Sequence, residues 1–285
     1  MDNKKRLAIQ GIAALIQNAD FRGFFRGGIY QGATKAVCVP GLNCYSCPGA
    51  VGACPIGSLQ NSLSGMTFRF PYYVLGLMIF FGALLGRAIC GFICPFGLLQ
   101  DLLNRIPFPK KIRTFKGDRK LRNLKYLVLI VLVVMVPIFV KLTPAFCKYV
   151  CPSGTLSGIL LALGDSRLFA VLGGTFFWKL SLLILVILTS IMIYRPFCKY
   201  ICPLGAFYGP FNKVALMKMS CDKSACVDCG ACSDVCGMGV DPSEDPNSTE
   251  CIRCGSCIKT CPAKALGYEF SLRKKESGDP LDTSA

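Results

Sequence analysis

Two cysteine runs near the C-terminal end constrain this 285-residue sequence more than any other feature. Both have the spacing C-x2-C-x2-C-x3-C, and they comprise Cys226, Cys229, Cys232 and Cys236, then Cys251, Cys254, Cys257 and Cys261. This spacing is typical of ligands to two [4Fe-4S] clusters, where the fourth cysteine of each run binds the other cluster. We therefore expect one cluster on Cys226, Cys229, Cys232 and Cys261, and a second on Cys251, Cys254, Cys257 and Cys236. Four-cysteine zinc sites are the alternative.

A second pattern, C-x3-C-P-x-G, occurs three times earlier in the chain, at Cys90/Cys94, Cys147/Cys151 and Cys198/Cys202. Two cysteines four positions apart lie on one face of a helix, and the following proline favours a break and the first turn of a new helix. Each element is thus predicted to be a helix break that presents two thiolates. The alternative is that these cysteines simply pack as small buried hydrophobic residues.

Three apolar stretches have the length of membrane-spanning helices, namely 72–93, 124–140 and 168–194. The loop 101–125 carries nine Lys or Arg against two Asp, so the positive-inside rule places it in the cytoplasm. The first and third stretches then run inward, and the C-terminal third is cytoplasmic. We expect a multi-pass protein of the cell (inner) membrane. The shorter apolar segment 7–17 is predicted to be an interfacial helix.

Each C-x3-C-P element offers two ligands and a cubane needs four, so the elements must pair. The predicted topology brings Cys90/Cys94 and Cys198/Cys202 to the same side, as ligands of a third cluster. The remaining pair, Cys147/Cys151, must take partners from a cysteine-rich loop that contains Cys38, Cys44, Cys47 and Cys54. A self-contained fourth cluster on that loop fits the spacing equally well.

Basic residues flank these elements, and a buried dianionic cluster needs compensating charge. The candidates are Arg87, Lys148, Arg195 and Lys199. Snorkelling to the membrane surface is the alternative role for them.

Composition excludes several classes of protein. The chain has no histidine, which removes His-ligated haem, zinc or copper and any Ser-His-Asp triad. Hydrophobic residues make up 53%, too many for a disordered chain. The net charge of +16 could indicate nucleic acid, but the basic residues cluster beside apolar segments, so we expect no nucleic-acid partner. No residue is identified as a catalytic acid, base or nucleophile.

The predicted fold is mainly α: a helical transmembrane bundle followed by a small α+β ferredoxin-like domain with two [4Fe-4S] clusters. The expected parts are an interfacial helix and cysteine-rich loop (1–70), the transmembrane bundle (71–213), the ferredoxin-like domain (214–271) and a polar tail (272–285). Cys221 lies outside both runs and stays unassigned.

The pairs Cys90/Cys94 and Cys198/Cys202, together with the two ferredoxin runs, resemble the NapH/NosR-type membrane-bound polyferredoxins over roughly residues 70 to 270. This resemblance implies a quinol-linked electron-transfer subunit. We expect an integral membrane iron–sulfur protein that relays single electrons between a cytoplasmic redox protein or flavoprotein and the membrane quinone pool, another membrane subunit or an outer-side partner. The alternative is a redox-sensing or maturation factor for another metalloenzyme.

Overall fold

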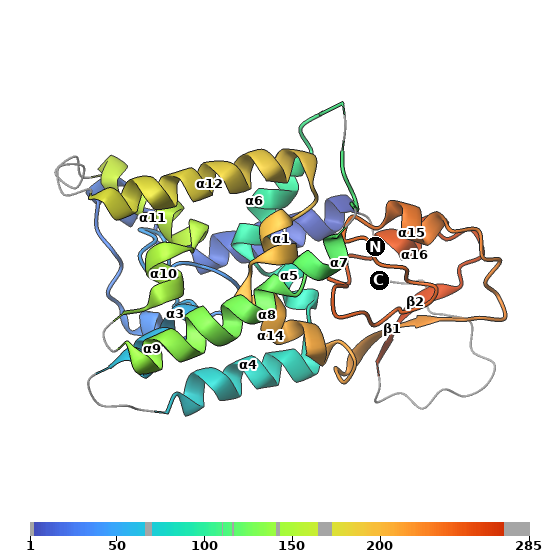
Figure 1. Ribbon diagram of the computed structural model, residues 1–285, viewed down its shortest axis with the longest axis horizontal. Coiled ribbons are helices and arrows are strands. Elements are labelled where there is room, and N and C mark those ends of the chain that lie inside the picture. The colour runs from blue at the N-terminus through green and yellow to red at the C-terminus, as the bar shows by residue number, and fades with distance from the viewer. Residues whose placement is uncertain are drawn as a thin grey trace.

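The computed structural model describes residues 3–65, 70–109, 111–115, 117–140, 143–164 and 173–270. The first half contains α1 (Asn3–Gln17), α2 (Arg22–Arg26), the 3-10 helix η1 (Ala33–Ala36), α3 (Pro55–Ser64), α4 (Tyr72–Leu85), α5 (Ala88–Phe92), α6 (Pro95–Asn104), α7 (Asp118–Leu121), α8 (Leu124–Val128), the π-helix η2 (Leu129–Met135) and α9 (Val136–Phe139). The second half contains α10 (Ala145–Tyr149), α11 (Pro152–Gly164), α12 (Gly174–Met192), α13 (Pro196–Tyr200), α14 (Pro203–Phe211), β1 (Met217–Cys221), α15 (Ala231–Val235), α16 (Ser256–Thr260) and β2 (Leu266–Phe270). The helices up to α14 form a bundle, and the strands with α15 and α16 form a smaller unit at one end of it (Figure 1).

Within the described residues, two helices are long and apolar enough to cross a membrane: Asp118–Phe139, which joins α7 to α9, and α12. They correspond to two of the three expected spans, although 168–172 lies outside the described residues. The third expected span, 72–93, is not one helix. The 14-residue α4 ends at Gly86, whose φ of 52° turns the chain before α5 begins.

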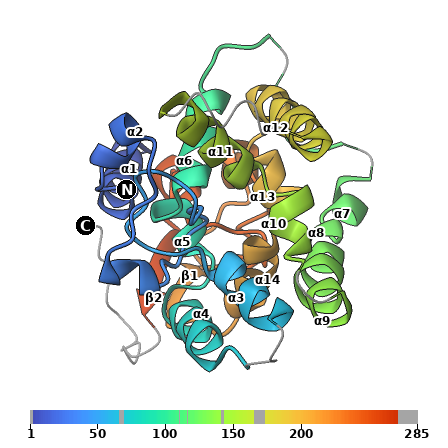
Figure 2. The same ribbon diagram turned by 90° about the vertical axis from the view of Figure 1, so that its left-hand side faces the viewer.

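The outer helices present apolar surface. In their most apolar windows, only 22% of Asp118–Phe139 and 11% of α12 is buried within the protein. Viewed from the helical end, α12, α8, α9 and α4 lie on the outside around α5, α13 and α14 (Figure 2). Exposed apolar surface on this scale needs another apolar medium to cover it.

Helix α1 adds to this exposed apolar surface. Its polar residues Arg6, Gln10 and Gln17 are buried, whereas Ile12 and Ile16 are exposed. A helix on a water-facing surface shows the opposite arrangement, with its apolar stripe toward the core. Helix α1 therefore presents apolar side chains on the outside of the bundle.

One apolar helix contains a π-helical segment with a clear local cause. The backbone N–H of Val136 bonds to the carbonyl of Val131, five residues back. In this pattern the next carbonyl, that of Leu132, would pair with residue 137, which is a proline and has no N–H. The amide of Gln60 on α3 donates to the Leu132 oxygen instead, at 2.8 Å.

The smaller unit, called the tail unit below, is closed by strands β1 and β2, which pair antiparallel from Met217↔Phe270 to Cys221↔Leu266. It is docked on the bundle by hydrogen bonds. Asn212 donates to the carbonyls of Ser248 and Cys251, both at 2.7 Å, and Arg253 donates to the carbonyl of Leu85 at 3.0 Å. The bundle and the tail unit therefore meet in a polar, buried contact.

The basic loop lies at the same end of the bundle as the tail unit. Ile112 forms a backbone bridge with Ile193, and Arg122 donates to the carbonyl of Gly239 at 3.2 Å. Lys110 and Lys116 lie outside the described residues, as does the polar tail 272–285. The loop and the tail unit therefore occupy one side of the molecule.

Candidate iron–sulfur sites

The tail unit arranges its eight motif cysteines around two open cavities. The cavity of about 410 Å³, called the tip site, is lined by Cys226, Cys229, Cys232 and Cys261. The cavity of about 280 Å³, called the base site, is lined by Cys236, Cys251, Cys254 and Cys257. Each cavity takes three cysteines from one run and the fourth from the other, which is the exchange that the spacing predicted.

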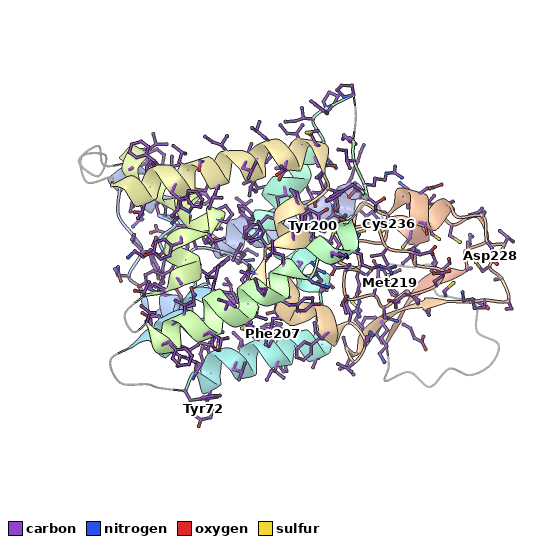
Figure 3. The ribbon with its side chains drawn as sticks, viewed as in Figure 1. Tyr72, Tyr200, Phe207, Met219, Asp228 and Cys236 are labelled. Atoms are coloured by element: carbon purple, nitrogen blue, oxygen red, sulfur yellow. The ribbon has the colours of Figure 1, made fainter. Side chains whose placement is uncertain are left out.

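The two cavities differ in position. Asp228, between two tip-site cysteines, lies at the outer end of the tail unit, and Cys236 of the base site lies nearer the helices (Figure 3). Cys229 at the tip is exposed. The base cavity is also lined by Ile112 and Tyr194 of the bundle. The tip site therefore faces outward, and the base site lies at the junction with the bundle.

The tip site has a fifth sulfur in its wall. Cys221 ends β1, lines the tip cavity and interacts with Cys226. No sequence motif connects Cys221 with the two runs, because the contact depends on how β1 pairs with β2.

Two of the C-x3-C-P elements converge inside the bundle. Cys90 and Cys198 lie in the short helices α5 and α13. Cys94 and Cys202 are extended, with ψ of 117° and 115°, and each precedes a proline that begins the next helix. Cys90, Cys94 and Cys202 each interact electrostatically with Cys198, and all four side chains are buried. These four are called the central thiols below.

The two converging elements hold each other through arginines. Arg87, three residues before Cys90, donates to the carbonyl of Cys198 at 2.8 Å. Arg195, three residues before Cys198, donates to the carbonyl of Cys90 at 2.5 Å. Both arginines are fully buried. Two of the four cations that the sequence singled out are thus placed beside the central thiols in a reciprocal arrangement.

The glycine of each C-P-x-G segment makes room for this contact. A Cβ atom at Gly97 would lie 3.0 Å from the Cys90 oxygen and 3.1 Å from Arg195. At Gly205 it would lie 3.1 Å from Arg87 and 3.2 Å from the Cys198 oxygen. These distances are tight for carbon, so the glycines allow the arginines to reach the opposite element.

Gln100 on α6 completes the surroundings of the central thiols. Its amide nitrogen donates to Cys198 Sγ at 3.1 Å, and its oxygen accepts from the N–H of Phe197 at 3.2 Å. The side chain is fully buried. A donor directed at a cluster sulfur tunes its reduction potential. Sequence reasoning missed this residue because nothing in the motif marks it.

A buried carboxylate holds the second arginine in place. Asp101 accepts from Arg195 at 2.6 and 2.5 Å and pairs with Arg6 of α1 at 2.8 Å. Burial alone would raise the pKa of Asp101, but the two guanidinium groups overcome this and hold it below its ordinary value. Asp101 therefore stays ionised and neutralises part of the buried positive charge.

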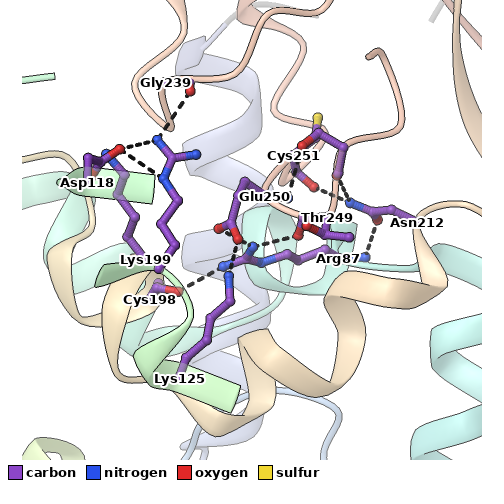
Figure 4. A network of polar contacts seen from close by, with 12 residues as sticks. Arg87, Asp118, Lys125, Cys198, Lys199, Asn212, Gly239, Thr249, Glu250 and Cys251 are labelled. Atoms are coloured by element: carbon purple, nitrogen blue, oxygen red, sulfur yellow. Dashed lines mark hydrogen bonds and ion pairs between the residues drawn. The ribbon is translucent and has the colours of Figure 1, made fainter. Parts of the chain in front are cut away.

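A second carboxylate connects the central thiols to the base site. Glu250, next to Cys251, pairs with Arg87 at 2.8 Å and also with Lys125 (Figure 4). Burial raises the pKa of Glu250, and the two cations outweigh this and keep it below its ordinary value. Arg87 thus contacts both the carboxylate beside a base-site cysteine and the backbone of a central cysteine.

The backbones also approach closely at this place. A Cβ atom at Gly91 would lie 2.5 Å from the carbonyl oxygen of Ile252. Because Gly91 follows Cys90 and Ile252 follows Cys251, the base site and the central thiols are joined by direct backbone packing. Only glycine fits at position 91 without moving one of the two segments.

The third C-x3-C-P element meets the cysteine-rich loop. Cys147 interacts electrostatically with Cys151, Cys54 and Cys44, and Cys151 interacts with Cys44. Cys54 and Cys151 are buried, and Cys44 and Cys147 are partly buried. These four are called the remote thiols below. Helices α10 and α3, which flank them, lie toward the end of the bundle opposite the tail unit (Figure 1).

The other two predicted cations take different positions. Lys148 is exposed and lies over the ring of Tyr149, and Lys199 pairs with Asp118 at 3.0 Å. A cation that sequence reasoning missed, Lys179 of α12, contacts the remote thiols instead, with its ammonium 3.2 Å from the Cys147 oxygen. Its position inside a predicted apolar span was the available signal.

The donor chemistry fits iron–sulfur clusters. In the described residues no three Cys, Asp or Glu side chains gather closely enough to hold a single metal ion. A cubane asks for a wider arrangement, because each of its four thiolates binds a different iron. Both tail cavities have four cysteines in their walls, and soft thiolate ligands suit iron–sulfur clusters.

Comparison with known proteins identifies the same regions. Residues 70–116, 125–168 and 175–220 match a 4Fe-4S binding domain family, and each segment contains one C-x3-C-P element. Residues 245–267 match a second family, also described as a 4Fe-4S binding domain. The cysteine-rich loop lies outside both matches. No solved structure matches the chain significantly.

Three relatives illustrate the range of similarity. The uncharacterized protein MJ0750 of Methanocaldococcus jannaschii is 31% identical over 67% of this chain and 76% of its own length. The putative electron transport protein YccM of Escherichia coli is 27% identical, over 80% and 65%. The ferredoxin-type protein NapH of Haemophilus influenzae is 25% identical, over 56% and 50%. With NosR also among the matches, the resemblance drawn from the cysteine motifs is confirmed, and the chain belongs to the 4Fe-4S binding domain family.

Proposed function

We propose that this protein carries single electrons along a line of [4Fe-4S] clusters that runs from the tail unit into a membrane-embedded bundle. The ligands at the tip and base sites are the eight motif cysteines, the central thiols hold a third cluster, and the element Cys147/Cys151 takes part in a fourth. When bound, these clusters supply reversible one-electron redox chemistry. The chain's own residues bind and space the clusters, compensate their charge and exclude water.

The observation that carries the proposal is the spatial order of the thiols. The tip site faces outward, the base site lies at the junction and the central thiols follow behind Gly91. Tyr208 lies near both groups, since its fully buried side chain is within electrostatic range of Cys90 and Cys94 and also of Cys54 and Cys38 of the loop. Such an order suits transfer in steps between neighbouring sites.

Buried positive charge supports the same function. Arg87 and Arg195 are fully buried beside the central thiols, and each is also paired with an acid. A [4Fe-4S] cluster bound by four thiolates carries a net negative charge, which is costly to bury without such compensation.

A membrane location is supported by the two apolar helices and their exposed surfaces. The basic loop lies beside the tail unit, so the positive-inside rule puts the tip site in the cytoplasm. A cytoplasmic redox protein or flavoprotein then exchanges one electron at a time at the tip site. The membrane quinone pool, or another membrane subunit, is the partner at the bundle.

The test is anaerobic purification of the full chain in detergent, followed by iron analysis and reduced-state EPR. We expect about 16 iron atoms per chain, from four clusters of four, with spin coupling between neighbouring clusters. About eight iron atoms would confine the clusters to the tail unit and overturn the relay through the bundle.

A second assay separates a relay from the alternative of a redox sensor or maturation factor. Reduced ferredoxin is offered as one-electron donor and a soluble quinone analogue as acceptor, with the protein in vesicles. We expect steady turnover that is lost in the double variant Cys90→Ser/Cys198→Ser, which leaves the tail sites intact. Full iron content without turnover would favour the sensor or maturation role.

A further inference from the structure

The three matched family segments leave one pair of cysteines, Cys147 and Cys151, without a second element to pair with. The central thiols already unite the other two elements. A cubane on Cys147/Cys151 therefore needs two further thiolates. In the described part of the chain, the cysteines around them come from the N-terminal loop, which lies outside the family matches.

We infer that Cys44 and Cys54 of this loop complete a fourth [4Fe-4S] site with Cys147 and Cys151, whereas Cys38 and Cys47 are not ligands. The inference rests on the proposed function, because it assigns the ligands of one cluster of that relay. It is carried by the geometry of the remote thiols.

Cys54 occupies the place of the second cysteine of a C-x3-C-P element. It is extended, with ψ of 129°, and Pro55 begins α3 directly after it. Its sulfur interacts with the backbone N–H groups two and three residues ahead, those of Ile56 and Gly57. The sulfur of Cys151 has the same two kinds of partner, Ser153 and Gly154.

The two segments face each other across a short gap. A Cβ atom built at Gly57 would lie 3.9 Å from Cys147 Sγ, and one built at Gly154 would lie 3.9 Å from Cys44 Sγ. The glycine after each proline thus sits against a sulfur of the other segment. Cys44 takes the place of the first cysteine, which the Cys54 segment lacks because position 50 is an alanine.

Cys38 and Cys47 have other contacts. The Cys38 thiol donates to the Ser58 hydroxyl at 3.4 Å, and its backbone bridges to Ala53. Cys47 has the same kind of N–H partners as Cys54, those of Gly49 and Ala50, but its sulfur also meets the hydroxyl of Ser157. What separates it from Cys44 and Cys54 is that it is not among the thiols that interact with Cys147 or Cys151. These contacts anchor the loop before Cys44 and between Cys44 and Cys54.

Two lysines supply the positive charge that a buried cluster needs. The ammonium of Lys179 lies 3.2 Å from the Cys147 oxygen and interacts with both Cys147 and Cys151. The ammonium of Lys35 donates to the Ala50 oxygen at 2.6 Å and interacts with Cys44 and Cys47. Lys179 thus corresponds to the arginines at the central thiols, since it too contacts the carbonyl of the first cysteine.

Gln60 joins the two segments independently of any cluster. Its oxygen accepts from the N–H of Cys147 at 3.2 Å while its nitrogen bonds to Leu132. The third element and the helix that follows Cys54 are therefore held in register by hydrogen bonds within the protein.

The test measures iron per chain in single variants of the full protein, purified anaerobically. Cys44→Ser and Cys54→Ser should each lower iron from about 16 to about 12, a loss of one quarter, as should Cys147→Ser. The matched controls Cys38→Ser and Cys47→Ser should keep about 16. Loss of a quarter of the iron in either control, with full iron in Cys44→Ser, would overturn the assignment.

A second readout covers variants that fail to accumulate. Cys44→Asp offers an oxygen ligand at the same position, so it should restore the fourth cluster with an altered reduced-state EPR spectrum. Cys47→Asp should leave the spectrum unchanged. The opposite pair of results would contradict the assignment. Parent protein with only eight iron atoms would instead contradict the proposed function, whichever cysteines are changed.

Discussion

The central and remote thiols share the helix break at a Cys-Pro step, but the segments that contribute their four cysteines differ. At the centre, two full C-x3-C-P elements meet, and the arginine before each element donates a hydrogen bond to a cysteine carbonyl of the other. At the remote position one full element meets a loop, and a lysine from α12 contacts the cysteine carbonyl. The comparison teaches that the short motif determines a helix break, whereas the identity of the partner and of the cation depends on the surrounding fold.

The largest expected difference between the two groups concerns their cations. Arg195→Gln should destabilise the protein by about 3–5 kcal/mol, because it breaks a fully buried ion pair with Asp101. Lys179→Gln should cost only about 1 kcal/mol, since Lys179 is half-buried and makes one hydrogen bond to a carbonyl. Thermal unfolding of the holoprotein in detergent measures both. Equal losses would remove the distinction between the two groups.

Acid should affect the surroundings of the central thiols through Asp101. Because the folded pKa of Asp101 lies below its ordinary value of 3.8, its contribution to stability is present above that value and is lost as pH falls through the lower folded pKa. Asp101→Asn should abolish this acid-dependent part of the stability, because the amide does not titrate. The measurement is the unfolding temperature from pH 6 to pH 3. The control is Asp245→Asn, at an exposed position. If the unfolding temperature of Asp101→Asn fell with pH as it does in the parent protein, the prediction would be contradicted.

Close backbone packing links the central thiols, and not the remote ones, to the tail unit. Gly91→Ala should cost about 1–3 kcal/mol, because the new methyl group overlaps the Ile252 carbonyl. It should also weaken the spin coupling between the base-site and central clusters in EPR. Gly76→Ala on α4 is the matched control, since a Cβ there meets nothing within 4 Å. Unaltered coupling in Gly91→Ala would show that the contact does not set the spacing.

The smallest expected effect compares the glycines of the three elements. All three lie in helices, so alanine gains similar helix propensity at each, at most about 1 kcal/mol. Gly97→Ala and Gly205→Ala introduce contacts of 3.0–3.2 Å to the arginine bridges, whereas the nearest atom at Gly154 is 3.7 Å away. The free energy of unfolding of Gly154→Ala should therefore be about 1 kcal/mol higher than that of the other two variants, as measured by thermal unfolding. The same free energy of unfolding in all three variants would argue against a close fit between these glycines and the arginines.

Sequence patterns predicted the local structure of the cysteine elements well. The proline after Cys94 and Cys202 begins a helix, and the preceding cysteine is extended, as the restriction on residues before proline requires. The exchange of Cys236 and Cys261 between the tail sites also agrees with the spacing. Such features depend on residues a few positions apart, where sequence fixes geometry.

Long-range features could not be predicted in the same way. Gln100 and Asp101 look like ordinary helix residues until α6 packs beside α13. The span expected over 72–93 ends early because Gly86 turns the chain so that Arg87 reaches Glu250, 163 residues away in sequence. Hydropathy cannot register such a turn, because it averages over the window and ignores the partner.

The carbonyl of Leu132 depends on another helix for its hydrogen bond. In the π-helical pattern the donor to that oxygen would be residue 137, a proline without an N–H, and Gln60 of α3 donates to it instead. In an apolar environment, an unpaired carbonyl costs several kcal/mol. The helix is therefore completed by a side chain of α3, which precedes it in the chain.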